Sequence, residues 1–160
     1  MAGNINWQSG AVASLAIQAS GTGLALTNGS AVVLSGAALG LLDNTGASGG
    51  PAFFALAQLF GSQSGFGAAT SANTTIDFYL VPSLDGTVFA QANAAGPLLP
   101  ANHYKGSFVV TTSGNNQYTL MLEGIPLLPV KYRGYIQNNT GQTMTSGWSI
   151  TINTFSEAYT

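Results

Sequence analysis

The side chains that could do acid–base or nucleophilic chemistry are few and far apart in this sequence. His103 is the only histidine, and the carboxylates are Asp43, Asp77, Asp85, Glu123 and Glu157. A hydrolytic triad needs a base beside its nucleophile, and a glycosidase needs two carboxylates close together. Segment 61–65 (GSQSG) has glutamine where a nucleophile elbow has serine. We therefore expect no catalytic residues and a protein that is not an enzyme.

Residue patterns for cofactors, metals and nucleic acids are missing as well. The chain has no cysteine, no EF-hand and no HExxH pattern, and segments 21–23 and 65–67 lack the third glycine of a dinucleotide loop. Lys105, Lys131 and Arg133 are too few to form the basic stripe that nucleic acid requires. We expect no cofactor, no metal and no nucleic-acid partner.

The apolar segments predict neither export nor membrane insertion. The longest one, 31–42, contains Ser35, Gly36 and Gly40 and is too short to cross a bilayer. Residues 1–4 lack the basic start of a signal peptide. We expect no membrane partner.

Charge is scarce. Three Lys/Arg and five Asp/Glu make up 5% of the 160 residues, with a net charge of −2. An ordinary soluble domain has about 25% charged residues, and mixed surface charge keeps such a domain soluble and monomeric. The composition therefore predicts that much of the surface contacts other protein, as in a subunit of an assembly.

Apolar and polar residues alternate with a period of two, which predicts β-strands. In segment 75–81, Ile76, Phe78 and Leu80 face one way, and Asp77, Tyr79 and Val81 face the other; segments 131–137 and 148–153 repeat the pattern. Such strands without a convincing helix indicate an all-β, jelly-roll-like β-sandwich in a single domain. Segment 51–60 fits a strand or a helix, and we favour a strand because it follows the turn-rich residues 43–50.

Two turns are expected to close hairpins. Segment 82–87 (PSLDGT) lies between predicted strands 77–81 and 88–90, and Asp85 and Gly86 are its structural turn residues. Asp bonds nearby backbone groups and Gly supplies a positive φ. Segment 113–116 (SGNN) is expected to join strands 107–112 and 117–122 in the same way.

Aromatic residues are the candidates for contact with a partner. Tyr79, Tyr135 and Tyr159 are expected to be exposed, either at an intersubunit interface or at a sugar site. We favour the interface, because few charged or amide residues cluster beside them and Tyr is enriched in interfaces. Residues 1–10 have no strand pattern and are expected to be an N-terminal arm that docks Trp7 on a neighbour, with residues 11–160 forming the sandwich. A chain that lacks residues 2–10 should then still fold.

The second half of the chain resembles a widespread family of small tailed-phage virion proteins. The matching segments are 76–87 (IDFYLVPSLDGT), 104–108 (YKGSF), 124–129 (GIPLLP), 138–142 (NNTGQ) and 146–147 (SG). They are turn and strand motifs within residues 70–155 and include no catalytic signature. The resemblance implies a β-sandwich on the virion surface, a capsid decoration or cement protein whose partner is the major capsid protein.

The resemblance also implies synthesis in the cytoplasm of the bacterial host. Since cement proteins often lie where capsid subunits meet at threefold positions, we expect a homo-oligomer, a trimer. The alternative is a tail- or fibre-associated β-sandwich module that binds host-surface carbohydrate. That module would have aromatic side chains beside Asn, Gln or Asp in a groove.

Overall fold

The computed structural model describes residues 5–16, 26–34, 41–46, 51–62, 74–89, 101–110, 117–144 and 148–159. Within these ranges, the side chains of residues 5–16, 32, 62, 117–119 and 157–159 are not described. The strands are β1 (Ile5–Ala16), β2 (Ala31–Val33), β3 (Leu41–Asp43), β4 (Phe54–Ser62), β5 (Thr74–Ser83), β6 (Tyr104–Val110), β7 (Gln117–Pro126), β8 (Lys131–Asn139) and β9 (Ser149–Tyr159). One turn of 3-10 helix, η2 (Ala101–His103), precedes β6.

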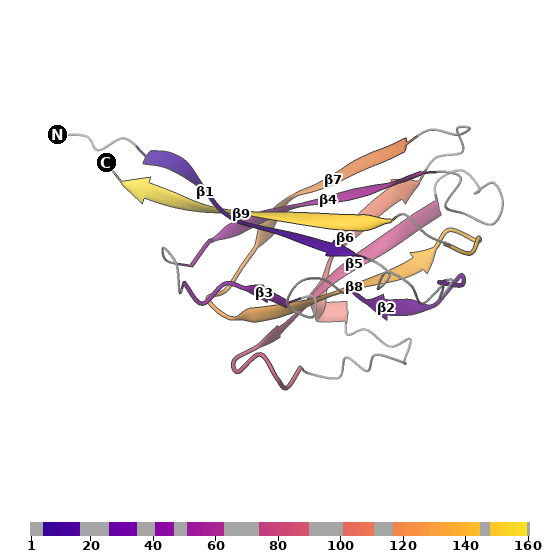
Figure 1. Cartoon of the computed structure of the whole chain (residues 1–160), viewed down its shortest axis with the longest axis horizontal. Helices are drawn as coiled ribbons and strands as arrows, with labels where there is room; N and C mark the ends of the chain where they lie inside the picture. The colour runs from indigo at the N-terminus through magenta and orange to yellow at the C-terminus, as the bar shows by residue number, and fades with distance from the viewer. Residues whose placement is uncertain are drawn as a thin grey trace.

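The strands form two antiparallel sheets that pack as a β-sandwich (Figure 1). The first sheet has the order β1-β9-β4-β7, and the second has β2-β8-β5-β6 with β3 also paired to β8. The pairing is nested along the chain: β1 with β9, β2 and β3 with β8, β4 with β7, and β5 with β6. The pairs β4–β9 and β5–β8 then join the nested pairs within each sheet. The expected all-β sandwich is confirmed.

The core lies between the sheets and takes one face of each central strand. Ile76 and Phe78 of β5 and Ile150 and Ile152 of β9 are fully buried. The ring of Phe78 meets that of Phe108 from β6, with the centroids 6.2 Å apart. Because successive strand side chains point to opposite faces, the period-two pattern predicts these inward positions correctly.

Segment 51–60 contains a strand, as predicted. β4 buries Ala55, Ala57 and Leu59 in the core and leaves Phe54 and Phe60 more exposed. Its backbone pairs on one side with β7 and on the other with β9. The sequence pattern is ambiguous because apolar residues occupy both faces of β4: Ala55, Ala57 and Leu59 face the core, and Phe54 and Phe60 face outward.

Both predicted hairpins are wrong. Residues 88–89 form no strand after the turn. β5 pairs instead with β6 over residues 74–79 and with β8 over residues 75–83, and Ala90 lies outside the described residues. The strands predicted around segment 113–116 exist as β6 and β7, but they belong to opposite sheets. Turn motifs indicate where a strand ends, whereas the burial of apolar faces decides which strands pair.

Residues 5–10 belong to β1, which corrects the expectation that residues 1–10 lack strand structure. Their backbone pairs with β9, with Ile5 opposite Tyr159 and Trp7 opposite Glu157. β1 is the edge strand beside β9 in Figure 1. Removing residues 2–10 would take away half of this pairing, so the expected folding of the truncated chain no longer follows. Residues 1–4 lie outside the description, and the docking of Trp7 on a neighbour stays a prediction.

Trp148 packs against the backbone of Gly61 at the inner face of the first sheet. Trp148 and Gly61 are both buried. A Cβ atom built on Gly61 would overlap the indole ring of Trp148. Position 61 therefore requires glycine because the ring approaches the backbone too closely for any side chain.

We predict that Gly61→Ala destabilises the fold by about 1–3 kcal/mol, because the added methyl group forces Trp148 out of its packed position. Urea denaturation measures the change. Phe60→Ala, at the exposed neighbouring position, is the control. It should lower the free energy of unfolding by less than Gly61→Ala does. Equal stability of Gly61→Ala and the parent chain would contradict the packing of Trp148 on this glycine.

Candidate functional site

The four aromatic residues predicted to contact a partner fall in two separate places. Trp7 in β1 and Tyr159 in β9 lie towards the same end of the first sheet, because β1 and β9 pair there. Their side chains are outside the described ones. Tyr79 and Tyr135 are opposite one another on β5 and β8 in the second sheet.

Tyr79 and Tyr135 are buried within this chain, so their expected exposure is wrong. Their side chains are 8% and 1% exposed. Together with Val81 they form a small cluster that is separate from the main core. Val33 and Phe89 pack against this small cluster. The guanidinium of Arg133 lies 4.2 Å from the centre of the Phe89 ring, a cation–π contact. The residues that follow β5 thus help to cover the two tyrosines.

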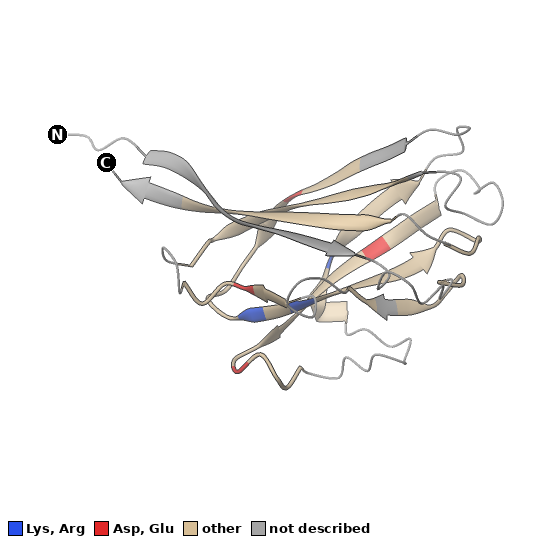
Figure 2. Ribbon diagram, in the orientation of Figure 1, with Lys and Arg blue, Asp and Glu red and all other residues tan. Residues whose placement is uncertain are grey.

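The outer face of the first sheet is nearly free of charge. We call it the β4 face; its described residues are Phe54, Leu56, Gln58 and Phe60 of β4, Met121 of β7, and Ser149, Thr151, Asn153 and Phe155 of β9. Phe60 is 44% exposed and Met121 is 52% exposed. Glu123 is the only charged residue among the described side chains of this sheet (Figure 2). Such a surface can contact protein without desolvating a row of charges.

The outer face of the second sheet carries a connected set of polar and aromatic side chains. We call it the Tyr104 patch; it consists of Asp77, Tyr79, Tyr104, Ser107, Gln137 and Asn139. Ser107 Oγ donates to Asp77 Oδ1, and Asn139 Nδ2 donates to Asp77 Oδ2 at 2.8 Å. Because the Ser107 proton is used in this way, Tyr104 OH is the donor in its 2.6 Å bond to Ser107 Oγ.

The two tyrosines of the Tyr104 patch also contact each other. The rings of Tyr79 and Tyr104 meet edge to face with centroids 5.5 Å apart, and Tyr79 OH donates to Gln137 Oε1 at 3.3 Å. Burial raises the pKa of Tyr79, and the charge of Asp77 raises it further. The sequence pattern places Asp77 and Tyr79 on one face, but it does not identify the flanking strands. The amides of Gln137 and Asn139 on β8 were therefore missed.

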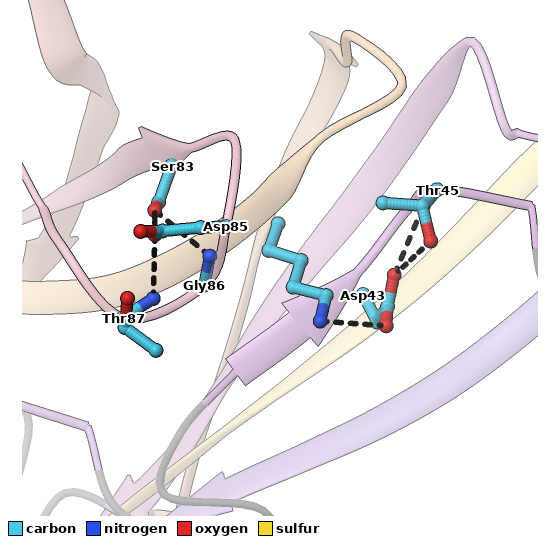
Figure 3. A network of polar contacts seen from close by, with 7 residues as sticks. Asp43, Thr45, Ser83, Asp85, Gly86 and Thr87 are labelled. Carbon is cyan, nitrogen blue, oxygen red and sulfur yellow. Dashed lines mark hydrogen bonds and ion pairs between the residues drawn. The ribbon is translucent and has the colours of Figure 1, made fainter.

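Asp85 and Gly86 lie in the turn that the sequence predicts (Figure 3). Gly86 has a φ of 75°. Asp85 Oδ1 accepts bonds from the backbone N–H of Thr87 at 2.8 Å, the backbone N–H of Val88 at 2.9 Å and Ser83 Oγ at 2.8 Å. These bonds, the one from Val88 first, hold the pKa of Asp85 well below its usual range. The carboxylate thus organises the end of β5.

The remaining described ionisable groups do not form a reactive centre. Asp43 accepts bonds from Thr45, which lower the pKa of Asp43, and lies 3.8 Å from Lys131 in an exposed ion pair (Figure 3). Burial first and the charge of Lys105 second lower the pKa of His103 in η2. Among the described residues, no three His, Asp or Glu side chains gather so as to hold a metal ion.

The described residues include no helix long and apolar enough to cross a membrane.

The NNTGQ segment holds a loop to its neighbours through a buried amide. Asn138 Nδ2 donates to the backbone oxygens of Leu26 at 2.8 Å and Gln142 at 2.7 Å, and Asn138 Oδ1 accepts from the backbone N–H of Thr140 at 3.1 Å. Asn138 is fully buried. This motif therefore supports the fold, and the side chain of Asn138 is inaccessible to modification.

Comparison of the chain with protein-family models, with curated proteins and with solved structures finds no match.

We predict that Asp85→Asn reduces the pH dependence of stability in acid. Since the pKa of Asp85 is lowered in the folded state, its stabilising effect is present above the unfolded pKa of about 4 and is lost as the pH falls below it. The difference in melting temperature between parent and variant should therefore be largest near neutral pH and shrink in acid. Leu84→Ala, an exposed change in the same turn, should keep the parent's profile. Parallel profiles for Asp85→Asn and the parent would contradict the role of this carboxylate.

Proposed function

We propose that this chain is a structural protein of a tailed-phage virion that decorates or cements the outside of the capsid. The observation that carries the proposal is the β4 face, a sheet surface with exposed Phe60 and Met121 and almost no charge. The resemblance of segments 76–87 and 138–142 to small virion proteins supports the same role. In the described structure these two segments organise the end of β5 and a loop.

We infer that the sandwich is a jelly roll. In a jelly roll, eight strands form two four-stranded sheets through two Greek keys. The nested pairing from β1–β9 to β5–β6 fits this plan, with β2 and β3 sharing one strand's place beside β8. Jelly rolls occur in viral capsid domains and in lectins, so the fold is shared by both candidate roles.

The proposed partner of the β4 face is the major capsid protein. A specific protein–protein contact buries about 1,000 Å² or more of surface in total. An unpaired buried ion costs several kcal/mol, whereas Gln58, Thr151 and Phe60 can enter such a contact without that cost. We propose a trimer at a threefold position of the shell, which the mass of the protein in solution would test. In this role the protein needs no catalytic group, cofactor or metal.

The experiment is to add purified protein to phage heads that lack it and to measure the number of bound copies. Phe60→Glu and Met121→Glu each place a charge on the β4 face. We expect each substitution to lower the affinity for heads by about tenfold or more, since an unpaired charge at an interface costs at least 1.4 kcal/mol. Circular dichroism checks that each variant is folded.

Val109→Glu is the matched control, because Val109 is an exposed apolar strand residue of the second sheet. It should bind heads as the parent chain does. Full binding by both β4-face variants, or no binding by the parent chain, would overturn the proposal.

The second candidate is a tail or fibre module that binds host-surface carbohydrate. One observation favours it: in the Tyr104 patch, Gln137 is bonded to Tyr79, whose ring meets that of Tyr104, and Asn139 is bonded to the nearby Asp77. Labelling the particle with an antibody to this protein distinguishes a position on the head from one on the tail.

A further inference from the structure

The Tyr104 patch has a feature that a purely structural surface does not need: an aromatic ring kept exposed beside a carboxylate. Tyr104 is 44% exposed. Its hydroxyl is bonded to Ser107, which in turn is bonded to Asp77. The ring of Tyr104 therefore extends from Tyr79 towards the carboxylate of Asp77 on the outer face of the sheet.

A β-bulge sets this position of Tyr104. The register of β5 and β6 shifts between Phe78, opposite Gly106, and Tyr79, opposite Tyr104, so that Lys105 is the extra residue. Gly106 has a φ of 150°, a backbone conformation that favours glycine, and a Cβ there would lie 2.9 Å from Leu122 Cδ2. Bulges of this kind redirect a side chain and are common beside functional sites.

The polar groups of the patch retain hydrogen-bonding capacity. A carboxylate offers about four acceptor positions, and each oxygen of Asp77 accepts one bond from the chain. Asn139 donates to Asp77 and Tyr79 donates to Gln137, so the two amides lie on the β8 side of Asp77 and Tyr79, and the ring of Tyr104 lies on the β6 side. Paired hydroxyl groups on a ligand would match this arrangement.

The charge of the patch limits the ligand further. Asp77 is its one ionised side chain, and an anionic ligand would meet like charge there. Lys105 is half-buried in the bulge, and burial lowers its pKa. An aromatic face with hydroxyl-binding groups suits a hydroxyl-rich ring, and the carboxylate of Asp77 disfavours a ring that carries an acidic group.

We propose that the Tyr104 patch binds a neutral pyranose unit of a saccharide. The sugar ring stacks on the ring of Tyr104, and its hydroxyl groups donate hydrogen bonds to the carboxylate of Asp77. Asn139 and Gln137 complete the polar side of the site. This binding goes beyond the capsid contact: it uses the opposite sheet, and it leaves the β4 face free for the shell.

The test is an NMR titration of the full-length, nitrogen-15-labelled protein with the methyl pyranosides of glucose, mannose, galactose and N-acetylglucosamine. We expect at least one of them to cause saturable shifts in the amide signals of Asp77, Tyr104 and Ser107. Tyr104→Ala should weaken this binding by about tenfold or more, because it removes the stacking surface. Asp77→Asn should weaken it as well, through the loss of a charged acceptor.

Met121→Ala on the β4 face is the matched control and should bind sugar with the affinity of the parent chain. If Tyr104→Ala does not fold, Asp77→Asn and Tyr104→Phe replace it in the comparison. Asp77→Asn should weaken sugar binding, whereas Tyr104→Phe, which keeps the aromatic ring, should largely retain it. The proposal is overturned if none of the four sugars causes saturable shifts at the patch, or if folded Tyr104→Ala or Asp77→Asn binds as tightly as the parent. Binding of the Tyr104 and Asp77 variants to phage heads should be unchanged, so failure at the patch is distinguishable from failure of the capsid role.

Discussion

The contact between the two sheets is the interaction on which the rest of the structure depends. On the first sheet, Trp148 covers Gly61 and leaves no room for a side chain there. On the second, the rings of Phe78 from β5 and Phe108 from β6 meet in the core. Burial of these inner faces fixes the register of every central strand, because a shift by one residue would turn each apolar side chain outward. The two outer faces are thereby fixed as well.

The two outer faces are chemically different. The β4 face presents Phe60 and Met121 with uncharged polar residues, whereas the second sheet carries Asp77, Lys131 and Arg133 on β5 and β8. A protein that lies flat on a shell needs one face for the shell and one for the surroundings. The proposed capsid contact and the proposed saccharide site use these two faces separately, so neither role needs the residues of the other.

Local patterns in the sequence predict the strands and the turn at Asp85, but not the partners of the strands. Alternation over 75–81 identifies Ile76 and Phe78 as core residues, because it depends only on neighbours along the chain. The burial of Tyr79 and Tyr135 depends on Phe89 and on the pairing of β5 with β8, which are separated by about 50 residues in sequence. The bulge that exposes Tyr104 likewise depends on register, which no local motif specifies.

A cryo-electron microscopy reconstruction of phage particles that carry this protein tests the capsid role most directly. We predict density for the sandwich on the outside of the head, with the β4 face against the major capsid protein and the Tyr104 patch directed away from the shell. Density confined to the tail, or a sandwich bound to the head through the second sheet, would contradict this arrangement.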